Sequence, residues 1–353
     1  MGGDFAPHAA VAGAVLAARA FGIGVALTGP ESEVRGELAR LATDGLDIQV
    51  VHAPEVIDMG ELSPAEAVRS SPDNSITRAL ELVQTGAADG FATAGHTGAT
   101  LAAALFTLGR LPGVRRPAVA VALPSLAGPC VLIDIGANTD VKPEFLAQFG
   151  IMGAAYAEKV LGIKRPRVGL LSIGEERGKG SQVVQEALPL LEATGVNFVG
   201  NIEGRDIPAG NADVAVMDGF TGNILLKFAE GIVALVEQIT RESAAGDQMA
   251  ILGALLMRPA LRRARARMDY RAFGGALLLG VRGVVVIGHG RSDPEAVKTA
   301  VGVAMRAAEQ GLVQAIQAGV QEKGGDGSRE SGEVGSTGAS PSPSPGLSSG
   351  PTP

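Results

Sequence analysis

Short aliphatic runs alternate with alanine-rich stretches from residue 9 to about residue 318. The aliphatic runs are too short for helices and are apolar at successive positions, which is typical of strands buried on both faces. They predict strands at Gly24–Thr28, Ile48–His52, Gly90–Thr93, Ala118–Leu123, Cys130–Ile135, Val168–Ile173, Asn197–Gly200, Val214–Met217 and Gly283–Ile287. The stretches between them predict helices, including Pro143–Val160, Gln182–Glu192, Asn223–Arg241 and Pro294–Gln321. This alternation indicates an α/β fold with a mostly parallel sheet covered by helices.

The two ends of the chain follow other patterns. Residues 9–29 superficially resemble a signal peptide or a membrane span, but Arg19 interrupts the run and the acidic Asp4 precedes it. We therefore expect a buried helix followed by a strand. Residues 324–353 consist mainly of Gly, Ser and Pro, which predicts a disordered tail after a domain that covers residues 1–323.

Composition narrows the class of protein. The chain has 353 residues and a net charge of −7, and this acidic balance argues against broad nucleic-acid binding. Aromatic residues make up only 3% of the chain, so the core must be built from aliphatic side chains. The one cysteine, Cys130, lies in an apolar run, which predicts a buried thiol and fits a reducing, cytoplasmic compartment.

Polar, glycine-rich turns follow several of the predicted strands. They are residues 93–99, 134–140, 172–181 and 218–223, and residues 2–4 have the same character. Glycines allow a backbone to approach a ligand, and free amides at the start of a helix attract an anion. Because ligands bind beyond the carboxyl ends of parallel strands, we expect these turns to converge on one crevice that holds an anion or a phosphate group.

The familiar nucleotide and metal motifs do not occur in the sequence. Residues 22–24 lack the third glycine of the dinucleotide fingerprint, and the turn around Lys179 is one residue shorter than a P-loop, with Gly180 in place of its Ser or Thr. The four histidines lack the spacing of metal ligands, and no G-x-S-x-G elbow supports a serine acyl-enzyme. We therefore expect no metal, nucleotide or other cofactor.

Four side chains in these turns each allow two interpretations. Lys179 is either a solvated loop lysine or a cation that holds phosphate and stabilises a developing oxyanion. His289 is either a structural turn histidine or a substrate contact. Asp4 and Asp134 either orient a ligand or cap the turns that follow them.

Together, the turns resemble the PlsX family of phosphate acyltransferases, which supply acyl phosphate for phospholipid biosynthesis. The resemblance rests on residues 1–7, 94–99, 134–138, 200–206 and 218–223, and it extends to Gly274-Gly275-Ala276 and His289-Gly290. These motifs occur in order and cover about residues 1–320, so that the predicted domain of residues 1–323 is similar to the whole family domain.

The resemblance implies a doubly wound α/β fold with helices on both faces of the sheet, and a homodimer. It implies an acyltransferase that converts acyl-ACP (the acylated acyl carrier protein) and inorganic phosphate to acyl phosphate and ACP, with Lys179 as the catalytic residue. Phosphate and substrate would be bound by Gly3, Asp4, Gly95, His96, Thr97, Gly98, Asp134, Gly136, Asn138, Gly222, Asn223 and His289. It further implies a cytoplasmic protein in peripheral contact with an anionic membrane and with a downstream glycerol-3-phosphate acyltransferase.

The chain departs from the family pattern at three points. His96 and Ser181 stand where the family has asparagine, and each keeps a hydrogen-bonding side chain, although His96 can also titrate. Family members have a short hydrophobic strand before the Met-Gly-Gly-Asp turn, and Met1 is the methionine of that turn here. We expect either a start codon assigned too late or a sheet that lacks a central strand.

An apolar segment meets a run of arginines between residues 249 and 271. We expect Pro259 to break the helix and create a projecting hairpin over about residues 242–271. This hairpin is either a dimer contact or an anchor that places apolar residues in lipid and arginines on anionic lipid or carrier protein, and the family resemblance supports the anchor. Its contact residues would be Leu252, Leu255, Leu256, Met257, Arg258, Arg262, Arg263, Arg265 and Arg267.

Two other classes of function fit the same patterns. One is a phosphotransacetylase- or dehydrogenase-like enzyme on a related scaffold, which would use acetyl-CoA or a nicotinamide cofactor. The other is a non-enzymatic, membrane-associated scaffold protein, whose function would depend on the hairpin and not on Lys179.

Overall fold

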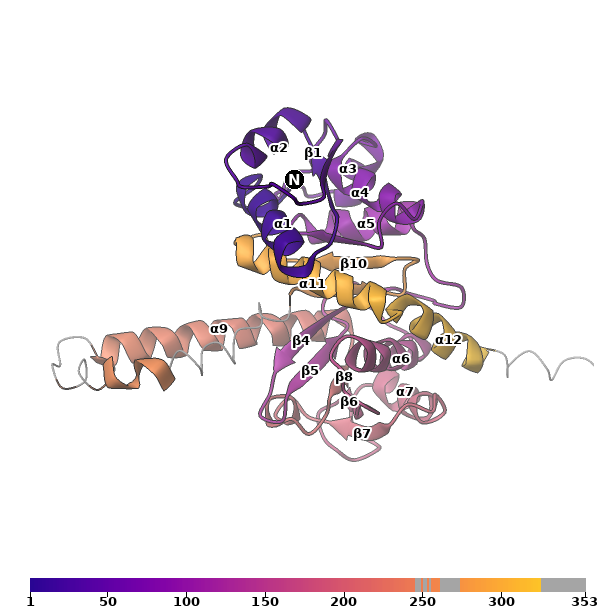
Figure 1. The fold of residues 1–353 in the computed structure, drawn as a ribbon. Coiled ribbons are helices and arrows are strands. Elements are labelled where there is room, and N and C mark those ends of the chain that lie inside the picture. The colour runs from indigo at the N-terminus through magenta and orange to yellow at the C-terminus, as the bar shows by residue number, and fades with distance from the viewer. Residues whose placement is uncertain (245–248, 250–252, 254, 261–273, 325–353) are drawn as a thin grey trace, which may run out of the picture.

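Two β-sheets and the helices around them form the body of the protein (Figure 1). The computed structural model describes residues 1–244, 249, 253, 255–260 and 274–324. In Figure 1 one part of the body contains α1 to α5 and the small sheet β1–β2, and the other contains β4 to β8 with α6 and α7. Helices α11 and α12 cross between them, which gives the predicted α/β architecture.

The elements follow one another in an almost regular alternation. In chain order they are α1 (His8–Phe21), β1 (Val25–Gly29), α2 (Glu31–Leu38), β2 (Ile48–His52), α3 (Pro64–Ser70), α4 (Ser75–Gln84), β3 (Gly90–Thr93), α5 (Thr97–Thr107), β4 (Ala118–Pro124), β5 (Pro129–Ile133), α6 (Pro143–Lys159), β6 (Val168–Leu171), α7 (Gln182–Glu192), β7 (Phe198–Ile202), α8 (Asp206–Ala209), β8 (Val214–Val216), α9 (Gly219–Ala244), β9 (Ala276–Leu279), β10 (Val284–Ile287), α11 (Pro294–Glu309) and α12 (Leu312–Gly324). The alternation confirms the pattern predicted from the sequence.

The large sheet contains two parallel groups that point in opposite directions. Its strand order is β3-β10-β9-β4-β5-β8-β6-β7. Strands β5, β8, β6 and β7 are parallel, and β3 is parallel to β10. Between the groups, the pairs β10–β9, β9–β4 and β4–β5 are all antiparallel. The two groups therefore run in opposite directions, and the registers place Ile287 of β10 level with Val121 of β4 and Ile133 of β5 level with Ala120 of β4.

Both faces of the central strands are buried, as the aliphatic runs predict. One face packs against α6, α7, α11 and α12, where Phe149 and Tyr156 of α6 are fully buried. The other face packs against α4 and α5 and is filled mainly by aliphatic side chains such as Leu80. Cys130 is fully buried in β5, and burial raises the pKa of its thiol to about 12, so the thiol stays protonated near neutral pH.

The observed helices and strands differ from the predicted ones at several places. The long helix predicted over Pro294–Gln321 is two helices, because the chain turns at Gly311 with a φ of 66°. Helix α9 begins at Gly219, four residues before the prediction, because the Asp218 carboxylate accepts hydrogen bonds from the amide and hydroxyl of Thr221. Strand β9 (Ala276–Leu279) was missed altogether.

The N-terminal helix and strand confirm that residues 9–29 form part of the folded body. Helix α1 packs closely on α11, because Gly13 has no side chain where a Cβ would lie 2.5 Å from Cβ of Val297. Gly302 gives α11 a similar approach to the ring of Phe21, with 2.8 Å between its would-be Cβ and Cζ. Interhelical contact of this kind, and not strand pairing, joins the small sheet to the rest of the body.

A groove of about 640 Å³ separates the two sheets. Its walls include residues 25–28 of β1 and residues 90–93 of β3. β1 pairs only with β2, and within the described residues β3 pairs only with β10, so the free edges of two strands face this groove. β1–β2 and the large sheet are therefore two separate sheets in this structure.

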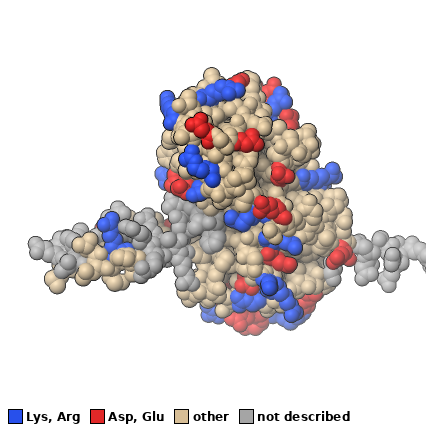
Figure 2. Space-filling model, in the orientation of Figure 1, with Lys and Arg blue, Asp and Glu red and all other residues tan. Residues whose placement is uncertain are grey.

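Helix α9 projects from the body as an arm (Figure 1). In the view of Figure 2 the described atoms of the arm are mostly tan, with one blue group. Exposed apolar side chains repeat along the helix. They are Phe220, Ile224, Phe228, Ile232, Val233, Leu235, Val236 and Ile239. Among the described helices, Gly219–Thr240 alone has the length and composition of a membrane span, a test that core helices of soluble proteins also pass.

The predicted hairpin is described only in part. Leu255, Leu256, Met257 and Arg258 are exposed on a helical segment, residues 255–260, that includes Pro259, so this proline does not end the helix as predicted. Leu252, Arg262, Arg263, Arg265 and Arg267 lie outside the described residues, as do residues 325–353 of the predicted tail.

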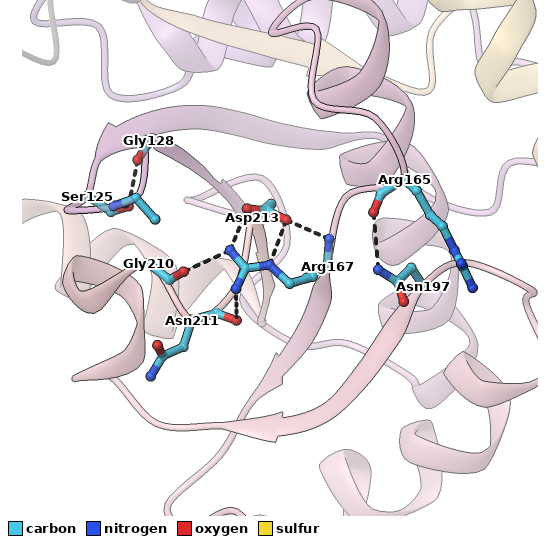
Figure 3. Close-up of polar contacts among 9 residues, drawn as sticks. Ser125, Gly128, Arg165, Arg167, Asn197, Gly210, Asn211 and Asp213 are labelled. Atoms are coloured by element: carbon cyan, nitrogen blue, oxygen red, sulfur yellow. Dashed lines mark hydrogen bonds and ion pairs between the residues drawn. The ribbon is translucent and has the colours of Figure 1, made fainter.

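An ion pair with several hydrogen bonds joins the starts of β6 and β8 (Figure 3). The Arg167 guanidinium donates from Nε to Oδ2 of Asp213 at 3.0 Å and from Nη2 to Oδ1 at 2.8 Å. It also donates to the carbonyl oxygens of Gly210 and Asn211, at 2.8 Å and 3.0 Å. This network fixes the loop before β8 against β6.

We expect Asp213→Asn to lower the free energy of unfolding near neutral pH by about 1–3 kcal/mol, because it removes the charged partner of Arg167. Burial alone raises the pKa of the Asp213 carboxyl, but the hydrogen bonds and charge of Arg167 outweigh it and hold this pKa below its ordinary value of 3.8. Stability linked to a lowered carboxyl pKa is complete above the ordinary value and is lost as the pH falls through the lowered one.

The difference between wild type and Asp213→Asn should therefore shrink as the pH drops below 3.8, as measured by urea denaturation at a series of pH values. Asp44→Asn is the matched control, since Asp44 is exposed and has no hydrogen bond or ion pair among the described residues. Equal stability of the two variants at neutral pH would contradict the role given to Asp213.

Candidate functional site

Three loops meet at the carboxyl ends of β3 and β10. The amide of Asp4 donates to the carbonyl oxygen of Gly290 at 2.7 Å, and the amide of Gly288 donates to that of Thr93 at 2.6 Å. A Cβ on Gly3 would lie 3.0 Å from the carbonyl oxygen of Gly290. Residues 2–4, 93–98 and 288–292 are thus packed backbone to backbone, and we call them the glycine cluster.

His96 caps the helix that leaves the glycine cluster. Its Nδ1 accepts a hydrogen bond from the amide of Ala99 at 3.2 Å, and its Nε2 lies 3.0 Å from the carbonyl oxygen of Glu61. Since both ring nitrogens of His96 have hydrogen-bond partners within the protein, this side chain holds the loop in shape. The amides of Thr97 and Gly98 have no acceptor among the described residues and lie at the start of α5, where an anion is stabilised.

Asp4 and His289, two further predicted residues of the glycine cluster, differ in the groups that they offer to a ligand. The Asp4 side chain is exposed and makes no hydrogen bond or ion pair within the described chain. The Nδ1 of His289 accepts a hydrogen bond from the amide of Arg291 at 3.1 Å, and its carbonyl oxygen accepts from Ser292. His289 therefore has the turn contacts of a structural histidine, and its Nε2 makes no hydrogen bond within the described residues.

Asp134 organises the loop that follows β5. Its carboxylate is fully buried and accepts five hydrogen bonds. The donors are the amides of Val119, Gly136, Ala137 and Asn138 and the side-chain amide of Asn138, at 2.7–3.2 Å. Because donors occupy both oxygens, this carboxylate acts as the cap of its loop.

The start of α9 packs directly on the same loop. The amide of Gly219 donates to the carbonyl oxygen of Asn138 at 2.7 Å. A Cβ on Gly222 would lie only 1.9 Å from the carbonyl oxygen of Asp134, so no larger residue fits there without movement of the backbone. Asn223 follows on the exposed side of the helix. The loop after β5 and the first turn of α9 therefore form one unit.

Lys179 lies on an exposed loop between β6 and α7. Nearby, Arg177 pairs with Glu192, and Arg205 pairs with Glu175 and Glu203. The Glu176 carboxylate, which forms no ion pair among the described residues, and the Lys179 side chain both lie against Gly174. Lys179 itself has no ion pair within the described chain, and the side chain of Ser181 caps α7 behind it. The ammonium group is thus left free for an anionic ligand.

Two buried polar atoms beneath the Lys179 loop lack hydrogen-bond partners among the described residues. They are Oγ of Ser172 and Oδ1 of Asn201. Nδ2 of Asn201 donates to the carbonyl oxygen of Glu176 at 2.9 Å, which fixes the loop from below. Neither side chain was among the predicted site residues, although residues 200–206 belong to the family resemblance and gave a signal for Asn201.

The predicted site residues fall into two groups, which follow strands that run in opposite directions. Asp134, Gly136, Asn138, Gly222, Asn223 and Lys179 follow β5, β8 and β6, three adjacent parallel strands, whereas Gly3, Asp4, Gly95, His96, Thr97, Gly98 and His289 belong to the glycine cluster. Within the described chain, no hydrogen bond or ion pair joins Lys179 to the other loops. The two groups of turns leave antiparallel strands whose carboxyl ends lie almost level along β4, and the expected convergence of all turns in one crevice stays a prediction.

No cluster of three or more His, Cys, Asp or Glu side chains in the described residues is arranged to hold a metal ion. Among the described residues, these loops offer backbone amides, hydroxyls, amide side chains, the exposed side chains of His289 and Arg291, and the Lys179 ammonium group. Such groups bind an anion and stabilise negative charge that develops on a reacting oxygen.

Residues 1–315 match a family model described as "Fatty acid synthesis protein". A phosphate acyltransferase from Pelotomaculum thermopropionicum is 49% identical over 321 residues, which cover 91% of this chain and 93% of the relative. A phosphate acyltransferase from Thermus thermophilus is 51% identical over 318 residues, which cover 90% and 95%.

Solved structures show a similar fold. The EutD phosphotransacetylase from Staphylococcus aureus has a TM-score of 0.59 at 18% identity, covering 86% of this chain and 91% of the neighbour. A phosphotransacetylase from Streptococcus pyogenes has a TM-score of 0.58 at 20% identity, covering 84% and 91%. These similarities confirm the predicted fold class.

We expect Gly222→Ala to lower the free energy of unfolding by about 1–3 kcal/mol, because the new methyl group collides with the Asp134 carbonyl oxygen. Guanidinium denaturation measures this change. Gly231→Ala is the matched control on the same helix, since nothing lies within 4 Å of its would-be Cβ. This control should be neutral or stabilising by up to about 1 kcal/mol, since Ala favours helices over Gly. Equal stabilities of the two variants would show that α9 does not pack on Asp134.

Proposed function

The chain belongs to the fatty acid synthesis protein family, and we propose that it converts acyl-ACP and inorganic phosphate to acyl phosphate and ACP. It is an acyltransferase, and relatives named phosphate acyltransferase match nine-tenths of it at 49–51% identity. That match along the whole family domain carries the proposal. The product would serve phospholipid biosynthesis in the cytoplasm, where a downstream glycerol-3-phosphate acyltransferase would consume it.

The proposed reaction needs an electrophile and a positioned anion. A phosphate oxygen attacks the thioester carbonyl carbon, a tetrahedral oxyanion forms, and the carbon–sulfur bond then breaks to release the carrier thiolate, which takes a proton from solvent. Phosphate is already anionic and needs no general base, which fits an Asp134 carboxylate fully occupied by donors. Lys179 would hold the phosphate and stabilise the oxyanion.

The loops on either side support this assignment of roles. Strands β5, β8 and β6 are adjacent and parallel, so the loop 134–138, the start of α9 and the Lys179 loop leave the same edge of the sheet. Gly136, Asn138, Gly222 and Asn223 would line the substrate there. The free amides of Thr97 and Gly98 in the glycine cluster offer a second anion-binding position, with Gly3, Asp4, Gly95, His96 and His289 around it.

Purified protein should form acyl phosphate from acyl-ACP and phosphate with no added metal, and Lys179→Ala should lower kcat by about 100-fold or more. Acyl hydroxamate formation after hydroxylamine trapping measures the product. Lys164→Ala is the matched control, because Lys164 is another exposed lysine and its side chain has no hydrogen bond or ion pair in the described chain.

Other outcomes of this assay identify the alternatives. Turnover with acetyl-CoA but not acyl-ACP would indicate a phosphotransacetylase. Absence of any acyl phosphate from folded wild-type protein would overturn the proposal. Full activity of Lys179→Ala would remove Lys179 from the catalytic role.

We also propose that the arm joins two copies of the chain and brings them to an anionic membrane. The apolar side chains of α9 are exposed along a single chain, and burial against a second copy would remove them from water. The exposed Leu255, Leu256, Met257 and Arg258 at the arm tip combine apolar groups with a cation, as interfacial anchors do.

We expect the double variant Leu235→Glu/Ile239→Glu to be monomeric, since it places two charges on the apolar face of α9. Sedimentation equilibrium of wild type and variant measures the difference. Gln238→Glu adds a charge at an exposed polar position of the same helix and should leave the dimer intact. A monomeric wild type, or a dimeric double variant, would contradict the dimer contact.

A further inference from the structure

A groove of about 530 Å³ with strongly basic walls lies beside the loop that follows β5. Its cations are Arg110, Arg115, Arg116 and Lys142, all exposed, and Glu144 is its one acidic residue. Apolar side chains, Leu105, Pro117 and Phe145, complete the lining. We call it the basic groove.

The positive charge of the basic groove is not neutralised by the described part of the chain. None of its four cations forms an ion pair there, although arginines elsewhere on the surface, such as Arg78 and Arg177, are paired with carboxylates. Four cations held together in a chain of net charge −7 repel one another, and this arrangement favours an anionic partner.

The walls of the groove are fixed before any partner arrives. The side chain of Gln148 bridges them, because its Oε1 accepts from the amide of Arg115 at 2.8 Å and its Nε2 donates to the carbonyl oxygen of Gly113 at 2.9 Å. The Arg110 guanidinium donates to the carbonyl oxygen of Arg115. A preformed surface loses less entropy on binding than a mobile one.

The basic groove lies at the same sheet edge as Lys179. Nδ2 of Asn138 donates to the carbonyl oxygen of Pro117 at 2.8 Å, so the groove shares a wall with the loop organised by Asp134. Pro117 precedes β4, and β4, β5, β8 and β6 are consecutive in the sheet. The strand that the groove adjoins, β4, and the strand that leads to the Lys179 loop, β6, are therefore three strand spacings apart, about 14 Å at roughly 4.8 Å per spacing.

We propose that the basic groove is the docking surface for the acidic face of the acyl carrier protein, an assignment that rests on the proposed function. Acidic side chains of the carrier would pair with Arg110, Arg115, Arg116 and Lys142, and an apolar carrier side chain would contact Leu105 and Phe145. The carrier's extended phosphopantetheine arm is long enough to deliver the thioester from there to Lys179. The concave shape suits a protruding protein helix, whereas a membrane anchor needs a convex apolar tip.

The test is Arg115→Glu/Arg116→Glu, compared with Lys164→Glu/Arg165→Glu, which changes the net charge equally on a surface away from the groove. We expect the groove variant to raise KM for acyl-ACP by about tenfold or more, because it replaces attraction with repulsion, and to leave kcat and KM for phosphate within about twofold. The control pair should leave all three constants unchanged. Raising the salt concentration should increase KM for acyl-ACP in the wild type but not in the groove variant, because salt screens the attraction between the groove and the carrier.

Binding of ACP that lacks its prosthetic group, measured by surface plasmon resonance, separates docking from catalysis. Loss of this binding in the groove variant alone supports the proposal even if wild type forms no acyl phosphate, in which case the proposed function fails and docking stands. If the groove variant keeps the wild-type affinity for ACP and the wild-type KM for acyl-ACP, the docking proposal is wrong. If its KM for phosphate rises instead, the groove belongs to the phosphate site and the docking proposal is also wrong. Arg115→Gln/Arg116→Gln, which only removes charge, gives the same readout if the reversal does not fold.

Discussion

The buried carboxylate of Asp134 is the constraint on which the candidate site depends. A charge in a protein interior is tolerated only where donors satisfy it, and here four of its five donors come from residues 136–138. The loop is thus folded around the charge. The carbonyl oxygen of Asp134 also sets how close α9 can come, since Gly222 packs on it. One residue therefore positions the loop after β5, the first turn of α9 and, through Val119, the start of β4.

The hydrophobic pattern predicted most of the fold but not the direction of its strands. β2, β3 and α7 were predicted residue for residue, and a clear N-cap, Ser181, marks the start of α7. β9 was missed, and its reversal turns β3 and β10 against β5. A central strand buried on both faces has the same apolar pattern whether it is parallel or antiparallel, so periodicity could not assign the loops to the two groups of strands. The glycine-rich turns were found, yet their grouping needed the strand order.

Which charged groups remain available is also a property of the fold and not of the local sequence. Arg177 pairs with Glu192 and Arg205 with Glu175, across 15 and 30 residues of chain, and these pairs leave Lys179 as the cation of its loop without a partner in the described residues. The basic groove escaped sequence reasoning for the same reason. Arg115 and Arg116 are adjacent, but Lys142 joins them only after β4 and β5 have paired. By contrast, the Arg-rich segment near residue 262 can be recognised from the sequence, because its charges lie close together along the chain.

The open groove between β1 and β3 has a consequence for local unfolding of the molecule. A two-stranded sheet has little stability by itself, and β1–β2 is held mainly by helices, among them the close contact of α1 with α11 at Gly13. Amide protons of β1 and β2 should therefore exchange with solvent through separation of this small unit, at a lower free energy than those of β5 and β8. Residues 2–4 would leave with it, so the glycine cluster is assembled only while those two helices stay in contact.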